Sequence, residues 1–247
     1  MIGGTLFAGA AAVAFFSIQS GNVAGSDPSV TAAGVDEKQR IAIEAIVRNY
    51  ILENPEIIPE AVEILQQRQN VKRISAIRNT AETPFAGAWA GNKNGDVVLV
   101  EFSDFACGFC RRSNADVERL ISEDPNLKVV YRELPILSDA SADAAKMAMA
   151  AARQGKYKAF HKAMFGGARP NNASIQLAAK KAGLDLTKAN VFIASEASQT
   201  EIDSNLNIAR TMEFTGTPAW IVGNQSMVGA VGYSELKKAI SETRAAK

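Results

Sequence analysis

The sequence predicts an α/β fold that carries an inserted helical subdomain and an N-terminal helical arm. The apolar, β-branched run Val97–Phe102 is typical of a strand buried on both faces. A second such run, Leu127–Leu134, follows after one helix, and a strand–helix–strand unit of this kind has parallel strands. The long helical stretch before Thr217 exceeds what one crossover needs, so we expect a subdomain inserted into the α/β domain.

Composition and charge exclude several classes of protein. The 247-residue chain is 47% hydrophobic and 21% charged, as globular proteins are, and its net charge of +1 argues against nucleic-acid binding. Its two cysteines and its one histidine, His161, cannot fill a four-ligand zinc site without carboxylates. Two cysteines also make at most one disulfide. We therefore expect no nucleic-acid partner, no zinc site and no disulfide-stapled fold.

The N-terminal residues resemble a secretory signal. An apolar stretch, Ile2–Ile18, is followed by the small and polar segment Gln19–Ser26, and the first charged residue is Asp27. An uncleaved membrane anchor is the alternative, although about 20 apolar residues are needed to span a bilayer. We expect residues 1–25 to be a signal peptide or a membrane anchor. Either places the remainder outside the cytoplasm, where disulfides persist.

Residues 26–80 are expected to form a linker and a helical arm. One helix is predicted from Asp36 until Asn54-Pro55 breaks it, and a second is predicted over residues 59–79. Aliphatic residues recur every seven positions along this region, at Ile57, Ile64 and Val71. This spacing is that of a self-association seam. An amphipathic helix packed on its own domain is an equal alternative.

The rest of the chain alternates helices with turn signals. Helices are expected throughout the insert, residues 138–214, over Ala140–Arg153, Tyr157–Phe165, Ile175–Ala182, Lys188–Glu196 and Glu201–Phe214. The strands Ala219–Val222 and Gln225–Val228 flank Gly223-Asn224, a two-residue hairpin signal. A last helix is expected to begin with Ser234 as its N-cap. The α/β domain is therefore predicted over residues 81–137 and 215–247.

The two cysteines lie two residues apart, at the predicted junction between a buried strand and a helix. At a helix start, Cys107 faces free N–H groups and the positive end of the helix dipole, which stabilise a thiolate and lower its pKa. A thiolate attacks disulfides, and Cys110, one turn later, can resolve the mixed disulfide that results. Gly108 relaxes the backbone between them, and Phe109 offers an apolar surface to a client chain.

Other roles for the cysteine pair are weaker. A structural bridge across so short a loop gains little entropy, and a zinc site would need a second pair. A copper(I) site is possible, because soft thiolates suit that ion. The position after a buried strand favours redox catalysis, with no cofactor beyond a Cys107–Cys110 disulfide.

Two segments resemble the DsbA-like branch of the thioredoxin superfamily: Val98–Cys110 (VLVEFSDFACGFC) and Thr217–Trp220 (TPAW). Asn49–Pro59 is similar to the N-terminal region of the suppressor-of-copper-sensitivity protein C (ScsC) group. The resemblance implies a thioredoxin fold. It also implies that Pro218 follows a cis peptide bond and faces the active cysteine, and that Thr217 binds the client backbone.

Glu101 matches the acidic residue that this family places near the buried thiol. The resemblance implies that Glu101 relays a proton from Cys110, through water. The alternative is a surface charge at a strand end. Asp104 is expected to be a loop or capping residue, and His161 to be structural.

The resemblance implies a periplasmic thiol-disulfide oxidoreductase that acts on unfolded or misoxidised extracytoplasmic proteins and is recycled by a membrane redox partner. Strongly oxidising members carry histidine between their cysteines, where this chain has Gly108-Phe109. We therefore expect a disulfide isomerase or reductase that oligomerises through residues 36–80, with a trimer as one candidate. The alternatives are a DsbA-type dithiol oxidase, a copper(I)-binding protein that uses the same thiolates, and a structural adaptor whose helices scaffold partners.

Overall fold

The computed structural model describes residues 34–247, so the predicted signal or anchor at 1–25 lies outside the described residues. Among residues 34–247, none of the helices is both long and apolar enough to cross a membrane. The described chain divides into two units, one ending at Pro59 and the other comprising Glu60–Lys247. Each unit is described by itself.

The first unit consists of helix α2 (Glu37–Glu53) and the first turn of α3 (Ile57–Glu82). The Asp36 carboxylate accepts the Gln39 N–H at 2.9 Å, and the Gln39 side chain accepts the Asp36 N–H, which forms a capping box. The helix ends at Asn54, before Pro55, as the sequence predicts. Its large apolar side chains are exposed: Ile41, Ile43, Ile46, Val47, Tyr50 and Leu52.

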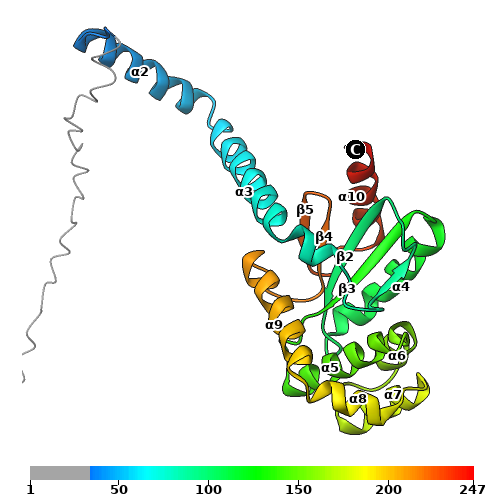
Figure 1. Cartoon of the computed structure of the whole chain (residues 1–247). Helices are drawn as coiled ribbons and strands as arrows, with labels where there is room; N and C mark the ends of the chain where they lie inside the picture. The colour runs from blue at the N-terminus through cyan, green and yellow to red at the C-terminus, as the bar shows by residue number, and fades with distance from the viewer. Residues whose placement is uncertain (1–33) are drawn as a thin grey trace, which may run out of the picture. The chain divides into compact units, whose positions relative to one another are not determined.

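The second unit is built on a five-stranded sheet in the order β1-β3-β2-β4-β5 (Figure 1). The central strands β2 (Val97–Ser103) and β3 (Leu127–Glu133) are parallel and are joined by α4 (Gly108–Glu123), which confirms the predicted strand–helix–strand unit. The hairpin of β4 (Ala219–Val222) and β5 (Gln225–Val228) pairs antiparallel to β2, with the predicted bounds.

The edge strand β1 (Trp89–Gly91) was not predicted from the sequence. It pairs antiparallel to β3, with Trp89 opposite Val130 and Gly91 opposite Lys128. Three residues are too few to show the alternation of a strand, and the adjacent turn residues 91–96 favour a loop. The strand therefore exists because β3 offers it a partner.

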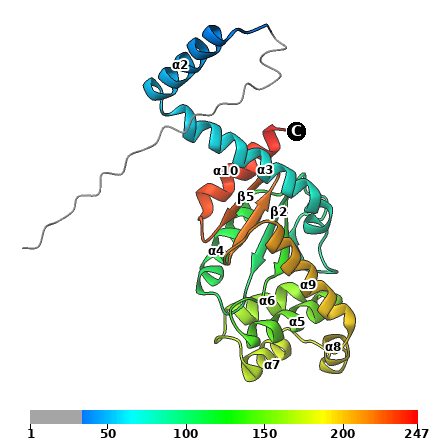
Figure 2. The ribbon, with the colours of Figure 1, turned by 90° about the vertical axis from the view of Figure 1, so that its left-hand side faces the viewer.

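The two faces of the sheet have separate cores. Figure 2 shows helices on both faces. Helices α4 and α10 (Tyr233–Ala245) cover the face that carries Val97, Leu99 and Val129. The part of α3 from Glu60 onward and α9 (Glu196–Thr211) cover the face that carries Val100 and Phe102. Successive residues of β2 thus point into different cores, as the period of a strand requires.

The insert comprises α5 (Asp139–Arg153), α6 (Tyr157–Phe165), α7 (Asn172–Lys181), α8 (Leu186–Ile193) and α9. Apolar residues of α5 to α8 belong to the same core as α4 and α10. Helix α7 begins earlier than expected, because Asn171 forms a capping box with Ser174. The predicted cap of the last helix is wrong: Gly232, at φ 86°, occupies the N-cap position instead of Ser234.

The predicted arm, residues 26–80, contains a segment that packs in the core of the second unit. Ile74 and Ala81 of α3 are fully buried against the sheet. Beyond them, the buried guanidinium of Arg132 on β3 ties the end of α3 to α9. It donates to the carbonyls of Thr80, Ala81 and Thr83 and to the side chains of Glu201 and Asn205. The residues with the self-association spacing, Ile57, Ile64 and Val71, all precede Ile74 and are exposed.

Candidate active site

Cys107 is the N-cap of α4, directly after the turn that follows β2. Asp104, itself buried, shapes this turn: its carboxylate accepts the Ala106 N–H at 2.8 Å, and its carbonyl accepts the Cys107 N–H at 2.9 Å. The second carboxylate oxygen accepts the N–H groups of Ile136 and Leu137, both at 3.0 Å. Asp104 is therefore a loop residue, as expected, and it fixes the turn to the segment after β3.

The Cys107 sulfur lies where a thiolate is stabilised. It accepts the Cys110 N–H at 3.4 Å, and its thiol lies 3.2 Å from the Thr217 carbonyl oxygen. Burial opposes ionisation, but hydrogen bonds that the sulfur accepts, among them those from the N–H groups of Cys110 and Phe109, outweigh it, so the pKa of the Cys107 thiol is lowered. These N–H groups lie in the first turn of α4 and are the free donors that the sequence predicts at the start of a helix.

Cys110 differs sharply from its neighbour. Its side chain is fully buried, and burial raises the pKa of the Cys110 thiol far above its ordinary value. The charge of Glu101 adds to this rise. Both cysteines are free thiols. The pair thus combines one thiol that ionises readily with one that holds its proton.

The Thr217-Pro218 peptide bond is cis, as the family resemblance implies, and it lies beside the active-site turn. The Pro218 carbonyl accepts the Gly229 N–H at 2.7 Å, and the Trp220 indole N–H donates to the Gly229 carbonyl at 2.9 Å. These contacts hold the loop at the start of β4. Within the described chain, the buried Thr217 hydroxyl has no hydrogen-bond partner.

Glu101 is a buried carboxyl group on the α4 side of the sheet. In register, it pairs with Tyr131 on β3 and Trp220 on β4. It is fully buried, and neither carboxyl oxygen has a hydrogen-bond partner among residues 34–247. Burial, followed by the charge of Cys107, raises the pKa of Glu101 to about 8. The alternative of a surface charge is therefore excluded.

Glu133 is a second buried acid, which sequence reasoning missed. It ends β3, and the Tyr157 hydroxyl donates to one of its carboxyl oxygens at 2.7 Å. Burial raises the pKa of Glu133 to about 8, although the hydrogen bond from Tyr157 lowers it. The signal that marks it is the alternation of the strand, which places Glu133 on the same face as the buried residues Leu127, Val129 and Tyr131. No cysteine contributes to this shift, which separates Glu133 from the thiols.

Exposed apolar side chains lie next to the turn. Phe109 is 56% exposed, with the Arg112 guanidinium 4.4 Å from its ring centroid. Gly108 is also exposed, so this part of the turn is open to solvent. Ile136 and Leu137 are exposed as well and are held beside the turn by Asp104, which the sequence did not reveal.

His161 is separate from the thiols. Its ring packs among Phe105, Tyr131, Tyr157 and Phe165, at centroid distances of 4.8–5.9 Å. Burial lowers the pKa of His161 to about 3, so the imidazole is neutral at physiological pH. In residues 34–247, no group of three or more His, Cys, Asp and Glu side chains could hold a metal ion.

Two family models match the chain. The model described as a DsbA-like thioredoxin domain matches residues 98–241. The model described as the copper resistance protein ScsC N-terminal domain matches residues 39–70. The first match includes both cysteines and the cis-proline, and the second lies in the helical arm.

Solved structures show the same relationship. A thioredoxin-like oxidoreductase from Silicibacter pomeroyi is 38% identical over 64% of this chain and 92% of that chain, with a TM-score of 0.62. A linker-deletion mutant of ScsC from Proteus mirabilis is 25% identical over 86% and 98%, with a TM-score of 0.69. A periplasmic thioredoxin-like protein from Salmonella enterica serovar Typhimurium is 28% identical over 69% and 97%, with a TM-score of 0.63.

Curated relatives carry the matching segment as part of a longer chain. A Na(+)/H(+) antiporter NhaA 1 from Salinispora arenicola is 26% identical over 156 residues, which are 61% of this chain and 24% of the antiporter. This chain therefore matches about a quarter of the length of those relatives. Since the DsbA-like model covers more than half of the 247 residues, the chain belongs to the DsbA-like family of thiol-disulfide oxidoreductases, with an N-terminal region of the ScsC type.

Proposed function

We propose that this chain is a periplasmic protein disulfide isomerase or reductase that works through Cys107 and Cys110. One observation carries the proposal: a thiol with a lowered pKa lies beside the cis-proline loop, and a buried thiol follows one turn later. This arrangement supports thiolate attack on a client disulfide, followed by intramolecular resolution.

The exchange begins when the Cys107 thiolate attacks one sulfur of a client disulfide. A Cys107–client bond forms, the client S–S bond breaks, and the second client sulfur leaves as a thiolate. In isomerisation, the freed client thiolate attacks another disulfide of the client, and the thiolate released there attacks the client sulfur of the mixed disulfide. A new client disulfide forms, and Cys107 leaves as a thiolate. In reduction, Cys110 loses its proton and attacks the Cys107 sulfur. The client is then reduced to a dithiol, and the Cys107–Cys110 pair is oxidised to a disulfide.

Glu101 is the group that we assign to the Cys110 proton. Its charge acts on the Cys110 thiol, and both groups have pKa values raised by burial. In the mixed disulfide, Cys107 carries no charge, which removes one of the two causes that keep Glu101 protonated. The carboxylate then accepts the Cys110 proton as the buried sulfur attacks.

Client binding is assigned to the surface around Cys107. We propose that the backbone of Thr217 pairs with an extended client segment, and that the ring of Pro218 lies against the client, since both residues directly precede β4. Phe109 offers an exposed aromatic ring, and Gly108 leaves space beside it. These properties suit unfolded or misoxidised chains, which expose apolar segments and irregular backbone.

The residues between the cysteines affect the direction of electron flow. Hydrogen bonds lower the Cys107 pKa, and Gly108-Phe109 adds no cation next to the sulfur. Without such a cation, the Cys107 thiolate is stabilised less than in members that carry histidine there, and the Cys107–Cys110 disulfide is a weaker oxidant. The lowered pKa nevertheless favours the dithiol to some degree, which keeps a DsbA-type oxidase as the second candidate. Copper(I) binding by the two thiolates is a third.

We expect the reduction potential of the Cys107–Cys110 pair to lie towards roughly −200 mV, as in isomerases and reductases. The measurement is equilibration of the chain with glutathione buffers of known ratio, followed by quantification of both redox forms. A potential near about −120 mV would instead make the chain an oxidase. Titration of the reduced chain with copper(I) provides the parallel test of the binding candidate.

We propose a periplasmic location, together with a membrane partner that returns the pair to its working redox state. The Salmonella relative is described as periplasmic, and an oxidising compartment supplies disulfide clients. The attachment or release of the chain depends on residues 1–25, the predicted signal peptide or anchor. An isomerase needs its pair kept reduced in that compartment, which is why a dedicated reductant is part of the proposal.

Oligomerisation through the arm is the remaining part of the proposal. Helix α2 carries a row of exposed aliphatic side chains, and Ile46 is 67% exposed. We expect Ile46→Glu to lower the mass in solution from a multiple of 26.3 kDa to that of one chain, because a charge would be buried where α2 packs on another copy. Light scattering after size exclusion measures this mass.

The matched control is Leu177→Glu on α7, where a similarly exposed leucine lies far from the arm in sequence. This variant should keep the mass of the parent chain. A parent chain that is already monomeric, or an Ile46→Glu chain of unchanged mass, would refute oligomerisation through α2.

A further inference from the structure

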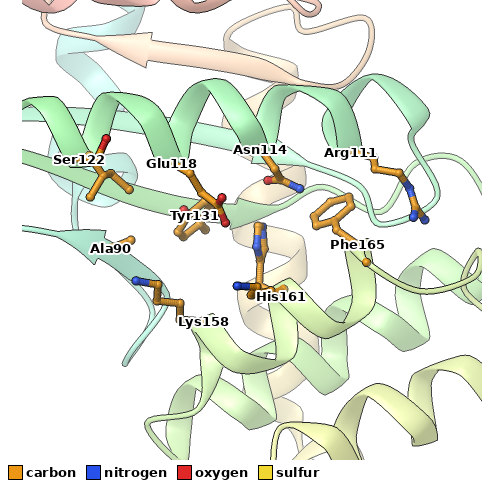
Figure 3. Close-up of a pocket in the computed structure, with 12 residues that line it drawn as sticks. Ala90, Arg111, Asn114, Glu118, Ser122, Tyr131, Lys158, His161 and Phe165 are labelled. Atoms are coloured by element: carbon orange, nitrogen blue, oxygen red, sulfur yellow. The ribbon is translucent and has the colours of Figure 1, made fainter.

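A cavity of about 530 Å³ lies between α4 and α6, with β1 and β3 along its side (Figure 3). Neither cysteine is among the described residues that line it. It is separate from the exchange site, since Thr217 and Pro218 do not line it either. Its size falls within the range of small-molecule sites, roughly 300–1,000 Å³.

Aromatic rings form part of the cavity wall. Tyr131 from β3 and Phe165 from α6 flank His161, each with its ring centroid 4.8 Å from the imidazole centroid. Figure 3 shows the imidazole pointing from α6 towards α4, between these two rings. These side chains are more than nine-tenths buried, and the parts of them that line the cavity offer apolar surface to a ring system.

His161 also brings an unused polar atom to this wall. The residue is more than nine-tenths buried, and in the described part of the chain its Nε2 atom has no hydrogen-bond partner. Buried polar atoms are nearly always paired, with protein groups, water or a ligand. Because burial keeps the imidazole neutral, its ring nitrogens can donate or accept a hydrogen bond.

The rim of the cavity is positively charged. Arg111, Lys158 and Lys162 line it together with a single acid, Glu118. Neither lysine forms an ion pair within residues 34–247, and both are exposed. Arg111 donates to the Gly167 carbonyl at 2.8 Å, which holds its guanidinium beside the start of the loop after α6. Three cations against one anion favour an acidic ligand.

We propose that this cavity binds a planar organic anion of one or two rings, such as an aromatic carboxylate. The ring system lies against Tyr131 and Phe165, a polar atom of the ligand supplies the missing partner of His161, and the anionic group meets Lys158 and Lys162. An inorganic anion would contact only the cations at the rim, and a neutral aromatic compound would contact only the aromatic wall. A ligand that contacts both must carry a ring system and a negative charge.

The test exploits the fact that His161 is the only histidine in the chain. In the full chain labelled with ¹³C,¹⁵N-histidine, the imidazole resonances report on this cavity alone. We expect naphthalene-2-carboxylate to shift them saturably. Inorganic phosphate should leave the imidazole resonances in place. Naphthalene-2-carboxamide should bind several-fold more weakly than the carboxylate, by up to about fivefold, since it lacks the charge that two exposed lysines attract.

The variant Lys158→Gln/Lys162→Gln should weaken carboxylate binding about fivefold, whereas it should leave carboxamide binding unchanged. The matched control is Lys93→Gln/Lys180→Gln, which removes the same charge from exposed positions outside the cavity. The control should retain parental affinity. The proposal is overturned by a His161 signal that does not move, by equal affinity for carboxylate and carboxamide, or by a rim variant that binds like the control.

Discussion

Cys107→Ser should lower the rate at which the chain reduces or rearranges a client disulfide by at least about a thousandfold. The serine hydroxyl does not ionise near neutral pH, so the hydrogen bonds that stabilise the Cys107 thiolate have no nucleophile to act on. The measurement is recovery of activity from a client with scrambled disulfides, followed at pH 7 in a glutathione buffer.

Cys110→Ser is the matched variant, because it changes the same atom at the buried position. It should retain the first attack and accumulate a covalent Cys107–client species, visible by mass spectrometry and cleaved by a reductant. Parental activity in Cys107→Ser, or a covalent complex formed by that variant, would contradict the assignment of Cys107 as the attacking thiol.

Glu101→Gln should slow the resolution of the mixed disulfide by about a hundredfold, because the amide cannot accept the Cys110 proton. The rate is measured by release of client from a preformed Cys107–client complex. The first attack should keep its rate within a few-fold, since the groups that stabilise Cys107 are left in place.

The same substitution should change how stability depends on pH. The Glu101 pKa rises from an ordinary 4.5 to about 8 on folding, so the folded chain holds a proton that the unfolded chain has lost between these values. This contribution to stability is complete below pH 4.5 and is lost as pH rises through 8. Glu101→Gln should therefore remove about 3 kcal/mol of the stability lost between about pH 5 and 8.

Glu133→Gln separates the two effects of Glu101. Glu133 is also buried and has the same raised pKa of about 8, but its carboxyl group accepts the Tyr157 hydroxyl, and neither thiol is among the causes of its shift. This control should flatten the pH dependence of unfolding by a similar amount and leave the resolution rate unchanged. A resolution rate that falls equally in both variants would identify Glu101 as a structural residue only.

His161 acts on stability in the opposite sense and is common to all these variants. Its pKa falls to about 3 on folding, so its contribution is present above the ordinary value of 6.5 and is lost as pH falls towards 3. The comparison between Glu101→Gln and the parent chain cancels this term. Urea unfolding at fixed pH values gives the free energies of both chains.

The strand–helix–strand unit and the hairpin were predictable because each rests on a strong local pattern. The run Val97–Phe102 is apolar enough to be buried on both faces, and Gly223-Asn224 specifies a two-residue turn. The position of Cys107 followed from the end of the first strand. The cis bond before Pro218 needed the family resemblance, since local sequence alone predicts only a turn.

Other features depend on tertiary contacts that no local pattern records. The strand β1 exists only as a partner of β3, and the burial of Ile74 follows from the docking of α3 on the sheet. Glu133 appears at the end of an apolar run, but its pairing with Tyr157 joins residues 24 positions apart. The missed cap at Gly232 reflects a backbone with positive φ, which a serine search does not detect.

Asp104 has a mechanical consequence for client selection. One carboxylate joins the turn that carries Cys107 to the backbone of Ile136 and Leu137, so the sulfur and these two exposed side chains move as one piece. The distance from the Cys107 sulfur to the side chains of Ile136 and Leu137 is then fixed. For the clients that we propose, the separation between the cystine and the nearest apolar side chain should therefore affect the exchange rate more than the overall composition does.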